Sequence, residues 1–101
     1  MKTSIKERHL QVTPELHAQI ERKLEKVERL LSDSAVSVQM ILDQEGLEFT
    51  AEVVLHARGD HMLHGDGHAA TWIQAVAMAV DKVDHQAHTL KGKWEARHRR
   101  S

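Results

Sequence analysis

The sequence is short of several residue types on which particular classes of protein depend. Its 101 residues include no cysteine, one proline and three aromatic residues other than histidine. Without cysteine there is no disulfide framework, no thiolate nucleophile and no cysteine-built zinc site. No apolar run approaches the ~18 residues that a membrane span requires, and polar residues rather than a signal-peptide core follow Met1. These absences favour a soluble, cytoplasmic protein, and the length predicts a single domain.

Charge is nearly balanced over the whole chain but not along it. The 14 lysines and arginines face 15 aspartates and glutamates, a net charge of −1, which argues against a generic nucleic-acid-binding protein. Residues 1–90, with 9 basic and 14 acidic side chains, carry −5, whereas residues 91–101, with 5 basic and 1 acidic, carry +4. A local basic segment can bind phosphates whatever the total charge, but it is also compatible with a solvated, frayed tail.

Hydrophobic periodicity predicts six elements along the chain. We expect strands at 2–8, 36–42, 47–57 and 61–66, a helix that starts at Thr13-Pro14 and ends near 32–33, and a second helix from about residue 69. Turns at 43–46 and 58–60 make the middle strands antiparallel neighbours. Gly65 and Gly67 loosen the last strand, and Gly92 interrupts the second helix and marks the end of its ordered part.

This order, β-α-β-β-β-α, predicts an α+β fold in which a four-stranded sheet carries both helices on one face. One apolar stripe runs along each helix. The stripes consist of Leu16, Ile20, Leu24, Val27 and Leu31 in the first helix and Ile73, Val76, Val80, Val83, Ala87, Leu90 and Trp94 in the second. The opposite face of the sheet is then polar and solvated, with Ser37, Gln39, Glu48, Thr50 and Glu52.

Nine histidines raise the question of a metal site. His61, His64 and His68 are interleaved with Asp60 and Asp66, but their spacing matches no zinc motif. On a strand His61 and His64 point to opposite faces, so we interpret the group as polar residues of an exposed edge strand. We therefore expect no metal and no cofactor. A metal-dependent or catalytic protein built on the histidines is the last of the three hypotheses about function, after the two given below. Neither a nucleophile context nor a glycine-rich phosphate loop is present, so the sequence does not predict an enzyme.

Basic residues on both helices lie off the apolar stripes. These residues are Arg22, Lys23, Lys26 and Arg29 in the first helix and Lys82, His85, Lys91 and Lys93 in the second. If both helices share one face of the sheet, these groups can converge on a single helical surface, opposite the acidic Glu48 and Glu52. The alternative is that they form ordinary ion pairs one helical turn apart, such as Glu25 with Arg29.

Two motifs carry a resemblance to a known family. The pattern Val12-Thr13, Leu16, Ile20 and Lys23-x-x-Lys26-Val27-Glu28 resembles the first helix of the ribosome hibernation promoting factors, also called ribosome-associated inhibitor, protein Y or sigma-54 modulation proteins. The pattern Asp81-Lys82-Val83-Asp84-x-Gln86, followed by Lys91-x-Lys93, is similar to their second-helix signature. The resemblance spans about residues 2–93. It implies a ribosome-binding domain over 1–93, with a topology like that of a double-stranded-RNA-binding domain, followed by a basic tail over 94–101.

The resemblance implies a non-enzymatic protein that binds the small ribosomal subunit in the channel of messenger RNA and the A- and P-site transfer RNAs. There it would block initiation and protect idle ribosomes in stress or stationary phase. Its partners would be 16S-type ribosomal RNA and neighbouring ribosomal proteins, without a membrane or a small-molecule substrate, and it would be monomeric off the ribosome. The candidate contacts to ribosomal RNA are Lys23, Lys26, Lys82, Lys91 and Lys93 by motif position, together with Arg22, His85, Arg97, Arg99 and Arg100. A general structured-RNA-binding module that acts off the ribosome is the alternative.

The chain also departs from the family pattern. Thr71, Ile73 and Ala77 stand where the family commonly has Asp, Tyr and Asp, and His85 and Thr89 replace an Arg and a Lys. The basic face is therefore thinner, and we expect weaker or more pH-dependent binding, which the arginines of the tail can offset. Acidification would charge His85, His88 and His98 and strengthen binding to RNA. Because the chain stops near residue 101, we expect no dimerisation domain of the kind found in long-form members.

Overall fold

A computed structural model describes residues 2–8 and 12–99, with the side chains of residues 96–99 left out. The elements are β1 (Lys2–Arg8), α1 (Pro14–Leu31), the 3-10 turn η1 (Ser32–Ser34), β2 (Ala35–Glu45), β3 (Glu48–Ala57), β4 (His61–Ala69) and α2 (Trp72–Arg99). The predicted order β-α-β-β-β-α and the α+β class are confirmed.

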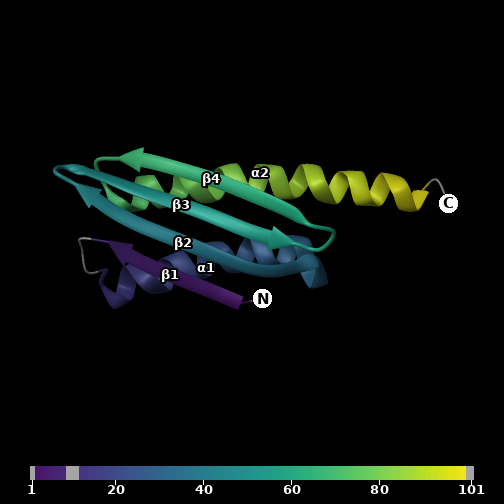
Figure 1. The fold of residues 1–101 in the computed structure, drawn as a ribbon, viewed down its shortest axis with the longest axis horizontal. Helices are drawn as coiled ribbons and strands as arrows, with labels where there is room; N and C mark the ends of the chain where they lie inside the picture. The colour runs from purple at the N-terminus through teal and green to yellow at the C-terminus, as the bar shows by residue number, and fades with distance from the viewer. Residues whose placement is uncertain (1, 9–11, 100–101) are drawn as a thin grey trace.

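The strands form one mixed sheet in the order β1-β2-β3-β4. The strand β1 runs parallel to β2, to which α1 connects it, whereas β2, β3 and β4 are antiparallel neighbours. Both helices lie on the same face of the sheet, as predicted, with α2 over β3 and β4 and α1 beside it (Figure 1). The opposite face, here called the outer face, carries neither helix.

The first helix begins and ends where the sequence predicts. The Thr13 hydroxyl accepts a hydrogen bond from the backbone N–H of Leu16 at 3.2 Å, and Pro14 occupies the first turn, where its missing N–H costs nothing. The helix ends at Leu31, and Ser32 follows with a positive φ of 54°. Four of the five predicted apolar positions are buried, and the fifth, Leu16, packs against the core from its margin.

The turn between β2 and β3 is shorter than predicted. Glu45 pairs directly with Glu48, so only Gly46 and Leu47 form the turn. The expected turn over 43–46 and the expected strand start at Leu47 are both wrong. Gly46 has a φ of 59°, which a two-residue hairpin turn requires and which glycine adopts at no steric cost. Leu47 consequently stands at the tip of the hairpin and is 92% exposed.

The strand β4 extends to Ala69, three residues beyond its predicted end, where it still pairs with Phe49 of β3, and its glycines serve the packing of α2. A Cβ atom on Gly65 would lie 2.3 Å from the carbonyl oxygen of Ala79, and one on Gly67 would lie 2.1 Å from that of Ala75. Both distances are far below van der Waals contact. The two glycines therefore bring α2 close to the strand instead of loosening it.

The second helix differs from the prediction at both ends. It starts at Trp72, and the Thr71 hydroxyl accepts a hydrogen bond from the backbone N–H of Gln74 at 3.2 Å, as an N-cap does. It continues through Gly92 to Arg99, so the expectation that Gly92 marks its end is wrong. Leu90 and Trp94 on either side of Gly92 both pack against the core and hold this part of the helix in place. The C-terminal turns project beyond the sheet (Figure 1).

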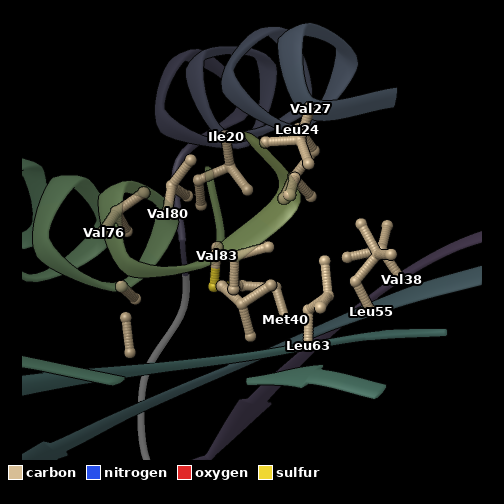
Figure 2. Close-up of a cluster of buried hydrophobic side chains, with 14 of the residues drawn as sticks. Ile20, Leu24, Val27, Val38, Met40, Leu55, Leu63, Val76, Val80 and Val83 are labelled. Carbon is tan, nitrogen blue, oxygen red and sulfur yellow. The ribbon is translucent and has the colours of Figure 1, made fainter. Parts of the chain in front are cut away.

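The core is apolar and lies between the helices and the sheet. Figure 2 shows side chains from α1, α2 and the strands meeting there, with Ile20 of α1 and Val80 of α2 directed into the same space. Ile73, expected on the apolar stripe of α2, is instead 59% exposed, whereas Ala75 and Ala79 are fully buried. The close approach at the glycines turns the alanines toward β4 and leaves Ile73 outside. Within the described ranges, neither helix is long and apolar enough to cross a lipid bilayer.

Candidate nucleic-acid interface

The charged side chains of α1 are divided between its two flanks. Glu21, Glu25 and Glu28 line a small hollow of about 180 Å³ together with Thr3, so this flank faces β1. Helical geometry places Lys23 and Lys26 on the other flank, toward α2. Lys23 is half-buried and Lys26 is exposed. The basic side of α1 is therefore turned toward the second helix, as the predicted interface requires.

The basic residues of α2 do not lie on one flank. Lys91 follows Val80, Asp84 and Ala87 at helical spacing, and Val80 is directed toward Ile20 of α1, so this flank faces α1. Lys91 is half-buried there. By the same geometry, Lys82 and Lys93 lie on the flank over β4. The helix layer therefore brings Lys91 to the same side as Lys23 and Lys26, but it does not bring Lys82 there.

Lys82 forms an ion pair with the edge strand. Its Nζ lies 2.9 Å from Oδ1 of Asp66 in β4. The hydrogen bond from Lys82 and then its positive charge lower the pKa of Asp66, with smaller contributions from His68 and His64. Both side chains are about half exposed, so the pair remains open to solvent. Any RNA contact by Lys82 competes with this interaction.

Gln86 lies one helical turn after Lys82 and closes the free edge of β4. Its Nε2 donates to the carbonyl oxygen of His64 at 2.7 Å, and its Oε1 accepts from the backbone N–H of His64 at 3.1 Å. The side-chain amide thus pairs with the peptide groups of the strand as a neighbouring strand would. The sequence analysis named Gln86 only as part of a motif. The spacing of four residues between Lys82 and Gln86, which puts both on one flank, is the signal that could have revealed this role.

The remaining candidate contacts lie outside this cluster. Arg22 is exposed and its Nε donates to the carbonyl oxygen of Ala18 at 3.4 Å, while His85 and Lys93 are exposed. The backbones of Arg97 and Arg99 are part of α2. The side chains of Arg97, His98 and Arg99 and the whole of Arg100 lie outside the described residues.

Most lysines and arginines of α1 and α2 form no ion pair with another described side chain. Among the described side chains, the only lysine and arginine within 4.0 Å of a carboxylate are Lys82, next to Asp66, and Arg29, whose NH2 lies 3.9 Å from Glu25. The predicted pair of Glu25 with Arg29 is thus confirmed. Lys23, Lys26 and Lys91 form no such pair with another described side chain.

The three clustered histidines lie on both faces of β4. His61 is on the helix side, where its ring centroid is 6.0 Å from that of Trp94. His64 and His68 are on the outer face, where their ring nitrogens lie 3.3 Å from Glu52 and 3.0 Å from Glu48. The opposite orientation of His61 and His64 is as predicted. In the part of the chain that the structure describes, no group of three or more such side chains is arranged to hold a metal ion.

Comparison with known proteins agrees with this fold. The sequence profile described as Sigma 54 modulation protein / S30EA ribosomal protein matches residues 3–95. A crystal structure of the Thermus thermophilus Protein Y N-terminal domain superposes with a TM-score of 0.78 at 21% identity, over 89% of this chain and 99% of that one. A ribosomal subunit interface protein from Coxiella burnetii gives 0.80 at 16% identity, over 91% and 99%. No curated protein sequence matches significantly.

Proposed function

The chain belongs to the Sigma 54 modulation protein / S30EA ribosomal protein family, and from this premise we propose that it is a ribosome hibernation factor. It binds the small ribosomal subunit in the channel that messenger RNA and the A- and P-site transfer RNAs otherwise occupy. In doing so it inhibits translation and protects idle ribosomes under stress or in stationary phase. It acts in the cytoplasm, without catalysis, as a monomer that contacts ribosomal RNA and neighbouring ribosomal proteins.

One observation supports this proposal above the others. Lys23, Lys26 and Lys91 lie on the facing flanks of α1 and α2, and none of them has a carboxylate within ion-pair distance among the described side chains. Lysines on rigid helices make sequence-independent contacts to phosphates, and each such contact releases a counterion. The binding is therefore expected to depend steeply on salt.

The remaining predicted contacts have different parts in this proposal. The described C-terminal turns of α2 project beyond the sheet and reach Arg99. We assign the basic tail 94–101, together with Lys93, additional contacts to RNA beside the domain formed by 1–93. Arg22 and His85 contribute from exposed positions. Lys82 contributes least, because Asp66 already engages its ammonium group.

Sedimentation with purified small subunits tests the proposal. Lys23→Glu/Lys26→Glu is expected to lower the affinity at least tenfold, because two attractive phosphate contacts become repulsive, and adding Lys91→Glu is expected to lower it further. The variant Arg8→Glu/Arg58→Glu, which changes the net charge by the same amount outside the two helices, should bind like the wild type. Absence of any subunit binding at low salt would contradict the proposal. Equal affinity for free duplex RNA and for subunits would favour the alternative of a general RNA-binding module.

A further inference from the structure

The strand β1 carries a row of cations on the face of the sheet away from the helices. Its register with β2 places Thr3, Ile5 and Glu7 beside the buried residues of that strand. The alternating positions Lys2, Ser4, Lys6 and Arg8 therefore line the outer face, about 7 Å apart along the strand. All four are exposed.

These cations are not neutralised by the strand's own carboxylate. Glu7 lies on the other side of β1, where one of its oxygens accepts from the backbone N–H of Val12 at 3.3 Å. Among the described side chains, neither Lys2 nor Lys6 has a carboxylate within ion-pair distance. Across the strand boundary they pair with Ser37 and Ile41, which carry no charge. Lys2 and Lys6 are thus positive charges that no described carboxylate neutralises.

A hollow of about 470 Å³ opens beside Lys2 on the outer face. Val54 and Met62 give it an apolar floor, and Met62 is 58% exposed. Gln39 and His56 supply side-chain donors and acceptors on its lining. Unpaired bases bind to surfaces of this kind, where an apolar or aromatic platform supports the base and polar groups bond to its edge.

The other half of the outer face has the opposite charge. A second hollow, of about 370 Å³, is lined by Glu45, Glu48, Glu52 and Asp66. Arg8 also lines this hollow, and Asp43, which is another of its lining residues, lies opposite Arg8 in the register of β1 with β2. The acidic side chains therefore disfavour a polyanion on the β3–β4 side and favour the half that contains Lys2. Lys6 stands at the boundary between the halves, since its register partner Ile41 lines the acidic hollow.

We propose that the outer face of β1, β2 and β3 is a second RNA-binding surface, specific for an unpaired segment. Lys2 and Lys6, about 13 Å apart along the strand, bind two separate phosphates of one RNA segment, and one base lies over Val54 and Met62 with its edge toward Gln39 and His56. The sheet separates this surface from Lys23, Lys26 and Lys91, so the protein contacts RNA from both faces. The inference deepens the proposed function, since it assigns a second contact to the same class of partner.

Titration with a 12-nucleotide oligouridylate tests the surface separately from the ribosome. The measurement uses the Lys23→Glu/Lys26→Glu/Lys91→Glu protein, in which the three lysines of the helix surface are reversed in charge, and follows its amide resonances and the anisotropy of a labelled RNA. We expect shifts at Ser4, Gln39 and Val54. Adding Lys2→Gln/Lys6→Gln should weaken binding about tenfold and lower the salt slope by about 1.4, as expected for two contacts to a single strand. Adding Arg29→Gln/Arg58→Gln instead, with the same change in charge, should alter neither.

Each outcome of this titration decides the inference. Shifts confined to α1 and α2, no binding at all, or equal losses in the two charge-matched variants would overturn it. Preference for an acidic peptide of the same charge over the oligonucleotide would also overturn it, and would identify the surface as a protein-binding site. Failure of the wild type to bind small subunits would contradict the proposed function alone, because the oligonucleotide result does not depend on the ribosome.

Discussion

The two edge strands of the sheet, β1 and β4, differ in whether side chains of a neighbouring element cover their free edges. In β4, Gln86 pairs with the peptide groups of His64, Lys82 binds Asp66, and α2 lies directly over the glycines. Six of the seven residues of β1 are exposed, and the strand pairs only with β2 among the described residues. An edge that is closed in this way contributes to stability. An edge that presents cations to solvent is available for binding, and its lysines also discourage strand pairing with other chains.

Gly67→Ala is expected to have the largest effect on stability, because it disturbs the packing of α2 on β4. The new Cβ would lie 2.1 Å from the carbonyl oxygen of Ala75 and 2.9 Å from the Cβ of Met78, so the helix must move away from β4. We expect a loss of about 3 kcal/mol in the free energy of unfolding, measured by urea denaturation. Gly92→Ala is the matched control, because its new Cβ would meet no described side chain and no other part of the described fold within 4 Å. It should stabilise the helix by about 0.5–1 kcal/mol, and a similar loss in both variants would contradict the role given to Gly67.

Gln86→Ala should open the edge of β4 without moving the helix. It removes both hydrogen bonds to His64 and leaves that backbone to water, at an expected cost of about 1–2 kcal/mol. The amides of β4 around His64 should also exchange with solvent faster, which hydrogen exchange measures. Gln74→Ala, at an exposed position of the same helix, should leave both quantities within error. Unchanged exchange at His64 would show that the side chain does not protect the edge.

Lys82→Met should change how stability depends on acid pH. In the folded protein Lys82 holds the pKa of Asp66 below its ordinary value of 3.8, so this interaction stabilises the fold above that pH and is lost as the pH falls through the lowered pKa. The wild type should therefore be more stable than the variant at pH 7, and the difference should shrink below about pH 4. Urea denaturation at pH 7, 5, 4 and 3 measures it. An equal difference at pH 7 and pH 3 would exclude the ion pair as the cause.

Lys6→Gln, on the opposite edge, should have the smallest effect on stability. The side chain is exposed and has no ion pair among the described residues, so the free energy of unfolding should change by less than about 0.5 kcal/mol. A larger loss, measured under the conditions used for Gln86→Ala, would mean that β1 is a structural edge as β4 is. The contrast between the two strands would then disappear.

Much of this arrangement could be predicted from local patterns. Thr13-Pro14 identified the start of α1, and the apolar spacing from Ile20 to Leu31 identified its buried side, because both depend on residues within a few turns of one another. Where the prediction failed, the local structure depends on contacts between residues far apart in the sequence. Gly92 favours a helix end by propensity, yet Leu90 and Trp94 hold the helix beyond it through contacts with the core. Gly65 and Gly67 weaken a strand by propensity, yet they are what allows α2 to approach.

The candidate site, too, could be predicted from the sequence only in part. The motifs identified Lys23, Lys26, Lys82, Lys91 and Lys93 as a group, and periodicity alone was enough to place each of them off an apolar stripe. Which flank faces which neighbour depends on how the helices are seated on the sheet. The sequence by itself therefore determined the elements, their order and the basic character of the helices, since these follow from nearest neighbours. Only the tertiary structure decided that Lys82 is paired with Asp66 and that Lys2 and Lys6 on the outer face have no ion pair among the described side chains, because both depend on residues brought together across the sheet.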